Sequence, residues 1–505
     1  MTIQGLLDDR PISIIPVHVD TLVIGAGPTG LGAASRLHQH GVGDWIIVDE
    51  LSGPGGLAQT ETTPEGFLFD LGGHVIFSHY KYFDQLVDWA KGGSIEPWNI
   101  HQRISYIWMK NRWIPYPFQT NLFCLDTEDK ISCVNGLIDA VLATQGKSVK
   151  ASSFDDWITK VMGDGIGNLF MRPYNFKVWA FPPSQMQCDW LGERVATVNL
   201  KNVTENIIRN VPNDNWGPNA VFRFPKEGGT GSIWKRVAGQ LPREKQFYDK
   251  RIIGIDFDRK LASFSDGSLC HYNKMISTLP LDRTLSWFGR EDLCSFLQYS
   301  STHVIGLGLR GTSLHDKKCW MYFPENDCPF YRCTVFSYYA DTNCPSRETL
   351  LSTMRIAGGE AASTTLLREG PYWSLMFEVS ESLHKPVESR EVLIESTIRG
   401  AINTKLISPE TEIVSIFYKR LERGYPTPSL HRDNGVVEGL RLLKEKDVWS
   451  RGRFGAWKYE VGNQDHSVMQ GVEAVDNILF GSPEMTVNYP NIVNGKRNED
   501  LIYKD

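Results

Sequence analysis

The sequence predicts an α/β protein that consists of a Rossmann-like nucleotide-binding domain, a helical insertion domain and a β-sheet domain. Three observations support this prediction. Residues 20–49 have the pattern of a strand, a glycine-rich turn, a helix and a second strand. Residues 137–210 have mostly helical spacing of apolar side chains, and residues 303–425 contain several short strand-like segments.

The first unit has the order expected for a dinucleotide-binding βαβ motif. Its apolar strand, G-x-G-x-x-G turn, helix, second strand and terminal acid are residues 21–24, 25–30, 31–39, 45–48 and Asp49. Gly25 permits a tight turn, Gly27 lets the backbone approach a pyrophosphate, and Gly30 lets helix and strand pack closely. The helix N-terminus attracts phosphate, and the acid about 20 residues further on accepts ribose hydroxyls. The turn alone does not separate NAD from FAD.

Two further glycine-rich segments favour a flavin. Residues 53–57 place a second glycine cluster after the second strand, where an extended FAD molecule needs another close approach of the backbone. The short strand 67–70 then enters Leu71-Gly72-Gly73-His74. Two glycines before a histidine indicate a backbone held against a flat ring. An ordinary turn with a packed histidine explains this second pattern equally well.

Composition limits the classes of function. The chain has 505 residues, with 41% hydrophobic and 22% charged residues and a net charge of −6. Without a long basic block, nucleic acid is not an expected partner. No apolar run reaches the roughly 18 residues of a membrane span, and residues 1–18 lack the basic start and apolar core of a signal peptide. The nine cysteines form no C-x-x-C, so we expect a cytoplasmic protein without a membrane partner or a metal site.

The later elements are expected in the following order. The predicted helices are residues 154–161, 166–170, 188–203, 232–238 and 467–477. The predicted strands are two within 104–114, then 250–256, 261–264, 274–278, 304–310, 320–323, 332–338, 372–379 and 412–418. The glycine turn before the last helix lies where flavoproteins of this kind close over the flavin ring.

Seven motifs then stand out together: residues 25–30, 72–77, 171–179, 215–219, 328–332, 423–428 and 451–464. In combination they resemble the UDP-galactopyranose mutases, specifically the eukaryotic, fungal type. The resemblance runs from about Val19 to the C-terminal region. It implies a flavin-dependent isomerase that interconverts UDP-galactopyranose and UDP-galactofuranose without net oxidation and supplies galactofuranose for cell-surface glycans.

The resemblance also implies the domain limits. We expect an N-terminal extension (1–18) and an FAD-binding domain in three parts (19–110, 221–300, and 446–505 with the C-terminal tail). We expect a mainly helical substrate and oligomerisation domain at 111–220 and a β-sheet substrate domain at 301–445. Fungal relatives form tetramers, so a homotetramer is expected.

The resemblance assigns binding residues. FAD is expected to contact Gly25, Gly27, Thr29, Gly30, Asp49, Leu57, Gly72, His74, Ile252, Arg453, Gly462, Asn463, Gln464 and Ser467. Uridine is expected at Tyr116, Phe118, Gln119, Asn175 and Trp179. The diphosphate and sugar are expected at Arg194, Asn219, Trp320, Tyr322, Arg332, Tyr339, Tyr425, Arg453, Tyr459 and Asn463. NADPH or NADH, as reductant, is expected to contact Phe77, Arg103 and Ser105, beside His74, Tyr116 and Arg453.

No side chain is an obvious nucleophile, because the sequence has no G-x-S-x-G and no Cys–His pair at a known spacing. The resemblance implies that N5 of the reduced flavin attacks galactose C1. The expected catalytic side chains are His74, Arg194, Arg332 and Asn219. The two guanidinium groups meet the diphosphate charge, and His74 orients the flavin rather than acting as a base.

Two alternatives share part of this pattern. An FAD-dependent oxidase or desaturase of the amine-oxidase-like fold has the same nucleotide motif, but it gives no reason for the Arg194 and Arg332 pair or for the uridine segment at 116–119. A non-catalytic protein that only binds a UDP-sugar or a flavin gives no reason for the sequence to retain Asn175, Tyr425 and Asn463 of the family pattern. Consumption of substrate with oxygen distinguishes the first alternative, and turnover by reduced protein distinguishes the second.

Overall fold

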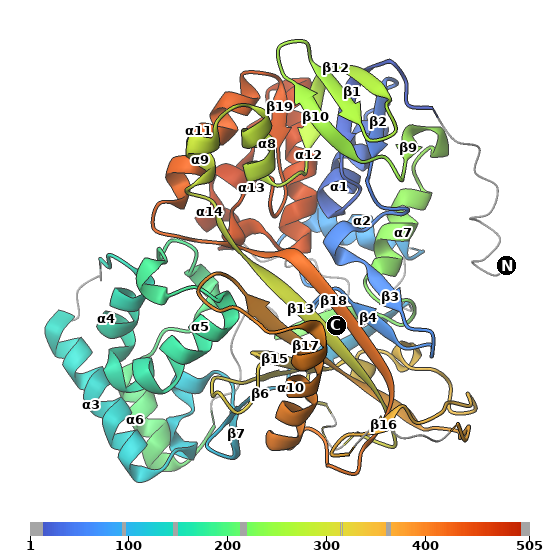
Figure 1. Ribbon diagram of the computed structural model, residues 1–505. Helices are drawn as coiled ribbons and strands as arrows, with labels where there is room; N and C mark the ends of the chain where they lie inside the picture. Colours follow the sequence, from blue (N-terminus) through green and yellow to red (C-terminus); the bar gives the residue numbers. More distant parts are fainter. Residues whose placement is uncertain are drawn as a thin grey trace.

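Two β-sheets organise the chain. The computed structural model describes residues 14–92, 97–144, 150–212, 220–313, 315, 317–359 and 365–495. A seven-stranded sheet with helices around it occupies the upper part of Figure 1, an eight-stranded sheet crosses the lower part, and a group of helices stands to one side of the second sheet.

The seven-stranded sheet carries the nucleotide motif. Its strand order is β10-β11-β12-β1-β2-β9, with β19 also paired to β12. The strands are β1 (His18–Ile24), β2 (Trp45–Val48), β9 (Gln246–Phe247), β10 (Ile252–Asp256), β11 (Leu261–Phe264), β12 (Leu269–Ser277) and β19 (Val448–Ser450). Because β1 is parallel to both β2 and β12, their carboxyl ends share one edge of the sheet.

Helices cover both faces of this sheet. One face packs against α1 (Pro28–Gln39), α2 (Lys81–Ala90), α7 (Gly231–Gly239) and α12 (Gln464–Phe480). The other face packs against α8 (Leu281–Trp287), α9 (Glu291–Cys294) and α11 (Arg432–Lys444). Two small pairs, β3 (Thr60–Thr62) with β4 (Leu68–Asp70) and β5 (Trp98–Gln102) with β8 (Val221–Pro225), join the two halves. Trp98 packs in this core, whereas Phe69 and Phe224 pack in the core of the second sheet.

Helices α1 and α12 lie unusually close because glycines line their contact. A Cβ on Gly32 would lie 2.6 Å from the Val468 carbonyl oxygen, and a Cβ on Gly471 would lie 2.0 Å from the Thr29 carbonyl oxygen. One turn further along both helices, Arg36 Nε donates to Asp476 Oδ1 at 2.7 Å. The two helices therefore run in the same direction, and both present their N-termini toward the carboxyl edge of β1.

The eight-stranded sheet has the order β16-β18-β13-β17-β15-β14-β6-β7. Its strands are β6 (Ser105–Met109), β7 (Arg112–Pro115), β13 (Gln298–Arg310), β14 (Trp320–Tyr322), β15 (Arg332–Val335), β16 (Arg355–Ile356), β17 (Tyr372–Glu381) and β18 (Glu412–Thr427). Helix α10 (Arg390–Asn403) packs on one face. The opposite face joins a large core shared with the helical insertion.

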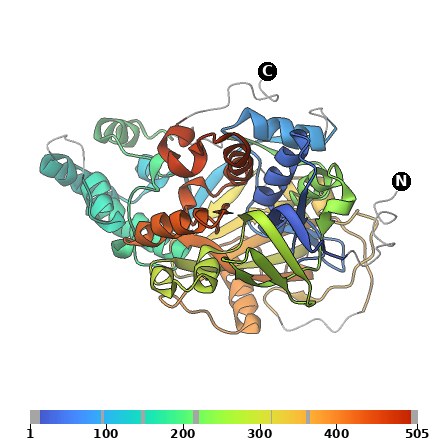
Figure 2. The same ribbon diagram turned by 90° about the horizontal axis from the view of Figure 1, so that it is seen from above.

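The helical insertion consists of α3 (Thr127–Thr144), α4 (Phe154–Ile166), α5 (Arg172–Trp179) and α6 (Leu200–Arg209). These helices, coloured from cyan to green, project to one side in Figure 2. Near the end of α4, Gly163 has a φ of +72°, and a Cβ there would lie 2.1 Å from the Gly136 carbonyl oxygen of α3. Two short helices, α13 (Met485–Asn488) and α14 (Pro490–Asn494), end the described chain.

Several predicted bounds are wrong. The helix predicted at 188–203 begins only at Leu200, because Gly192 has a φ of +41° and the Asn199 side chain accepts from the backbone N–H groups of Lys201 and Asn202. The strand predicted at 332–338 ends at Val335 in a 3₁₀ turn. The predicted last helix starts three residues earlier, at Gln464.

The domain limits also need correction. His18, assigned to the N-terminal extension, is the first residue of β1. The limit at residue 110 divides the β6–β7 hairpin, which belongs to the eight-stranded sheet. Helix α11 lies before the limit at 445 but packs on the nucleotide-binding sheet through Val436 and Leu443. Over the described ranges, none of the helices has the length and apolar character needed to cross a bilayer.

Candidate active site

The first turn has the geometry of a nucleotide cradle. Gly25 has a φ of +93°, which an L side chain rarely adopts. The Ala26 N–H donates to Asp49 Oδ2 at 2.6 Å, and the Leu51 N–H donates to Asp49 Oδ1 at 2.8 Å. Burial raises the pKa of the Asp49 carboxyl. Asp49 therefore holds the turn in place, and its remaining lone pairs can face a ribose.

The second glycine cluster meets the first one. A Cβ on Gly56 would lie 3.2 Å from the Cα of Gly27, and Gly55 and Gly56 have φ values of +120° and +53°. Side chains at these positions would fill the space beside the N-terminus of α1. Leu57 follows with 37% of its surface exposed. This arrangement leaves backbone N–H groups accessible to a pyrophosphate.

The N-terminus of α12 completes the cradle. Asn463 is its N-cap residue, and its carbonyl accepts from the Ser467 N–H at 2.8 Å. Gln464 accepts from Trp234 Nε1 at 2.9 Å. Together, two aligned helix N-termini and facing glycines fit the diphosphate of a dinucleotide. Ile252 is buried in β10, two residues after Lys250, whose N–H donates to the Asp49 carbonyl oxygen at 2.8 Å.

The segment around His74 leads from this cradle toward the eight-stranded sheet. Gly72 has a φ of +133°, and the Gly73 N–H donates to Glu378 Oε1 at 3.0 Å. Burial lowers the pKa of His74 to about 4, with Arg453 and Arg332 acting in the same direction and Glu378 opposing them. Its buried Nδ1 has no hydrogen-bond partner among the described residues. His74 is therefore neutral and offers a buried polar atom to a ligand.

Glu378 was missed by the sequence analysis. It binds Arg332 through two hydrogen bonds, from Nε to Oε1 at 2.9 Å and from Nη2 to Oε2 at 2.8 Å. Tyr331 donates its hydroxyl to Oε2 at 2.7 Å. The available signal was one acid within the otherwise largely apolar strand 372–379.

The predicted substrate residues form two neighbouring aromatic groups. In the first, the rings of Tyr116 and Tyr322 lie 5.0 Å apart, and the Arg103 guanidinium lies 5.4 Å from the Tyr116 ring centre. Arg332 lies 5.7 Å from the Trp320 ring centre. Burial raises the pKa of Tyr322, so its hydroxyl stays protonated and can donate to an anion.

The second group lies against the insertion domain. The Tyr459 ring lies 5.9 Å from that of Tyr425 and 4.7 Å from that of Trp179. Arg194 stands 5.5 Å from the Tyr459 ring centre, and Arg453 stands 4.9 Å from that of Tyr425. Arg194 Nη2 also donates to the carbonyl oxygen of Glu460 at 2.7 Å. Arginines from separate segments thus face tyrosines in one place.

Other predicted contacts are enclosed by protein. Phe118 is fully buried and stacks on Phe170 at 4.7 Å. Gln119 Nε2 donates to the Ala196 carbonyl at 2.7 Å, and Asn175 Nδ2 donates to the Met171 carbonyl at 2.7 Å. Tyr339 is fully buried, with its hydroxyl 3.4 Å from the Cys319 carbonyl oxygen.

Two NAD(P)H residues lie in the same region, and one catalytic residue is not described. Ser105 begins β6 and is buried, and Phe77 packs against the shared core. Asn219 lies outside the described residues, as does the segment 215–218 of its motif.

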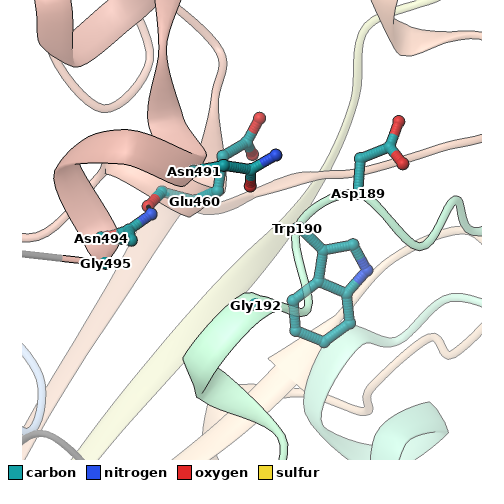
Figure 3. A pocket seen from close by; sticks show the side chains of 7 residues that line it. All are labelled: Asp189, Trp190, Gly192, Glu460, Asn491, Asn494 and Gly495. Carbon is teal, nitrogen blue, oxygen red and sulfur yellow. Dashed lines mark hydrogen bonds between the residues drawn. The ribbon is translucent and has the colours of Figure 1, made fainter.

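A separate pocket of about 270 Å³ lies beside the Arg194–Glu460 contact (Figure 3). It is lined by Asp189, Trp190, Gly192, Glu460, Asn491, Asn494 and Gly495. The Glu460 carboxylate is already bound to Arg432 through two hydrogen bonds. None of the predicted substrate residues lines this pocket, so it is a neighbour of the candidate site.

A buried cluster of His79, Asp465 and His466 joins the His74 segment to α12. Asp465 Oδ2 accepts from the His79 N–H at 3.1 Å and lies 2.8 Å from His79 Nδ1. One nitrogen or oxygen atom from each of the three side chains lies within 4.8 Å of the other two, a spacing that could hold a metal ion. Because Asp465 already accepts from His79 at a helix N-terminus, the geometry serves to fix the segment against α12.

Comparison with known proteins finds similar sequences and structures. A family profile described as an NAD(P)-binding Rossmann-like domain matches residues 23–89. The crystal structure of a reduced UDP-galactopyranose mutase is 44% identical, with a TM-score of 0.86, over 95% of this chain and 98% of its own.

More distant structures share the fold alone. A putative protoporphyrinogen oxidase from Exiguobacterium sp. 255-15 is 13% identical, with a TM-score of 0.63, over 93% of this chain and 100% of its own. A putrescine oxidase with bound putrescine is 12% identical, with a TM-score of 0.55, over 92% of this chain and 99% of its own. With the 44% match over nearly the whole chain, the chain belongs to the UDP-galactopyranose mutase family and is an enzyme of the isomerase class.

Proposed function

We propose that this enzyme binds FAD and interconverts UDP-galactopyranose and UDP-galactofuranose only when the flavin is reduced. The observation that carries the proposal is that Arg194, Arg332 and Arg453 each lie over the ring of a tyrosine or tryptophan predicted to bind substrate. An oxidase of the same fold has no need for such a diphosphate-binding group. The facing glycines support the presence of a flat cofactor there, as does His74 Nδ1, which has no hydrogen-bond partner in the described part of the chain.

The cofactor would be held by the residues of the cradle. The pyrophosphate would contact Gly25, Gly27 and the N-termini of α1 and α12. The ribose would contact Asp49. When bound and reduced, the flavin would supply the nucleophile at galactose C1, for which the sequence has no G-x-S-x-G and no Cys–His pair at a known spacing. His74, neutral because burial lowers its pKa to about 4, would orient the ring through a hydrogen bond. It would not serve as a general base.

The chain's own residues would bind and activate the leaving group. Arg194 and Arg332 would donate to the diphosphate oxygens and stabilise charge as the C1–O bond breaks. Tyr322 and Tyr459, whose pKa values are raised by burial, would add neutral donors. Tyr116 and Trp179 would hold the uridine, and Gln119 and Asn175, which each already donate to a backbone carbonyl, would do so through their amide oxygens. The enclosing aromatic side chains would limit access of water to C1.

We further propose the finer assignments that the resemblance suggested. NADPH or NADH would reduce the flavin from the same cleft, against Arg103, Ser105 and Phe77. The enzyme would act in the cytoplasm as a homotetramer of the fungal type and would supply galactofuranose for surface glycans. A shared site is supported by the contact between Arg103, which is predicted to bind NAD(P)H, and the ring of Tyr116, which is predicted to bind uridine.

The test is incubation of dithionite-reduced protein with UDP-galactofuranose, followed by separation of the nucleotide sugars. UDP-galactopyranose should accumulate with the reduced enzyme. Fully oxidised, oxygen-equilibrated enzyme should give none, because it lacks the electron-rich flavin. Equal turnover in both states would refute the proposed requirement for reduced flavin.

A further inference from the structure

The Glu378 carboxylate is the point at which the predicted diphosphate site and the predicted flavin site meet. It lies on the central strand β17, with 3% of its side chain exposed. Oε1 accepts from both Arg332 Nε, at 2.9 Å, and the Gly73 N–H, at 3.0 Å. Oε2 accepts from Arg332 Nη2 and from the Tyr331 hydroxyl. Oε1 therefore accepts hydrogen bonds from an arginine of the predicted diphosphate site and from the backbone of the predicted flavin site.

Because Glu378 accepts from both, the Arg332 side chain and the backbone at Gly73 have little room to move independently of each other. A Cβ on Gly73 would lie 2.9 Å from Arg332 Nη2 and 3.0 Å from Glu378 Oε1. Gly72, directly before, has a φ of +133°, and His74, directly after, has a pKa that responds to both Glu378 and Arg332. A change in the backbone at 72–74 must alter the environment of the Glu378–Arg332 pair.

The energetic reason is the cost of burying a charge. A buried carboxylate that loses its guanidinium partner is strongly destabilised unless other donors compensate. When Arg332 turns some of its donors to a diphosphate, Glu378 depends more on the Gly73 N–H and the Tyr331 hydroxyl. When the backbone at Gly73 turns away, Glu378 instead binds Arg332 more firmly and withholds it from the diphosphate.

We propose that Glu378 is a positioning residue that couples anion capture by Arg332 to the conformation of the Gly72–His74 segment. The inference rests on the proposed function, since it takes this segment to face the flavin and Arg332 to meet the diphosphate. Coupling between two sites is reciprocal. Because the Gly72–His74 segment is taken to face the flavin, we expect reduction of the flavin to change its conformation. UDP should then bind the oxidised and reduced enzymes with different affinities and shift the flavin midpoint potential.

The experiment compares wild type, Glu378→Gln and a control, Glu381→Gln, as flavin-loaded proteins. Glu381 lies on the same strand and also pairs with an arginine, Arg420. UDP dissociation constants are measured by intrinsic tryptophan fluorescence in the oxidised and dithionite-reduced states, and the midpoint potential is measured with and without UDP. We expect the two constants to differ several-fold in wild type and in Glu381→Gln, and to become equal within twofold in Glu378→Gln.

A merely structural defect weakens UDP binding in both redox states and leaves their ratio unchanged, so an unchanged ratio in Glu378→Gln overturns the coupling. Equal constants in the wild type overturn it as well. Should Glu378→Gln not fold, Gly73→Ala tests the same link from the backbone side. Its methyl group displaces Arg332, and we expect it to reduce the ratio, whereas a wild-type ratio refutes the coupling. A wild type that binds neither FAD nor UDP refutes the proposed function instead.

Discussion

The contact between Gly471 and Thr29 allows a sharp test of how the nucleotide cradle is held. A Cβ at residue 471 would lie 2.0 Å from the Thr29 carbonyl oxygen and 2.8 Å from the Ala33 nitrogen. Both neighbours are backbone atoms of α1 and cannot rotate away. An ordinary contact begins at 3.4 Å, so Gly471→Ala must separate the groups by about 1.4 Å. The N-termini of α1 and α12 then no longer face one pyrophosphate correctly.

The expected cost follows from overpacking. Forcing a methyl group into a closely packed interface costs about 1–3 kcal/mol, and a displacement of about 1 Å at a binding site lowers function by roughly 100-fold. We expect Gly471→Ala to be purified with less than one tenth of the wild-type flavin and to unfold at lower urea. Gly239→Ala is the control, because a Cβ there meets nothing within 4 Å. Wild-type flavin content and urea midpoint in Gly471→Ala would refute this account of the cradle.

Three further predictions follow from the site. Flavin released by heat from the purified protein should be FAD, identified by chromatography, and release of NAD or of no flavin would contradict the cradle assignment. Arg194→Ala should weaken UDP binding by on the order of 2–5 kcal/mol while flavin content stays unchanged; calorimetry giving wild-type affinity would exclude Arg194 from the diphosphate site. His74 should lower stability as pH falls from 6.5 to about 4, since only the unfolded chain takes up its proton there. The loss should reach at most about 3 kcal/mol. In His74→Asn, the urea midpoint should depend less on pH over that interval. A pH dependence equal to that of the wild type would show that protonation of His74 is not linked to unfolding.

Much of the nucleotide-binding region could be predicted because its signals are local. Gly25 needs a positive φ, the strands on either side of α1 are apolar, and Asp49 ends the second strand. The helix over 232–238 was predicted within one residue at each end, although Gly239, expected to end it, is its last helical residue and Gln240 is the C-cap. The second glycine cluster at 53–57 was noticed from its place after the second strand, but the close approach of Gly56 to Gly27 was not predicted.

The errors came from features that depend on distant contacts. The chain at 188–199 has helical spacing of apolar residues, but those side chains fill the core between the insertion and the eight-stranded sheet. The β6–β7 hairpin is sequence-adjacent to the nucleotide domain, yet β6 pairs with β14, more than 200 residues away in the chain.

The candidate site shows the same limit. Single positions such as Tyr459 and Arg453 carry no chemical signal of their own, and only the resemblance named them. The resemblance did not reveal what fixes Arg332. Its partner Glu378 is 46 residues further along and becomes visible only when β15 and β17 pair.

The central claim is that Arg194 and Arg332 hold a nucleotide diphosphate next to the glycine cradle. The most direct measurement is a crystal structure of the reduced protein with UDP bound. We expect the diphosphate oxygens to lie within hydrogen-bonding distance of both guanidinium groups and the uracil to lie beside Tyr116. A UDP molecule located elsewhere, with Arg332 paired to Glu378 and no contact from Arg194, would contradict it.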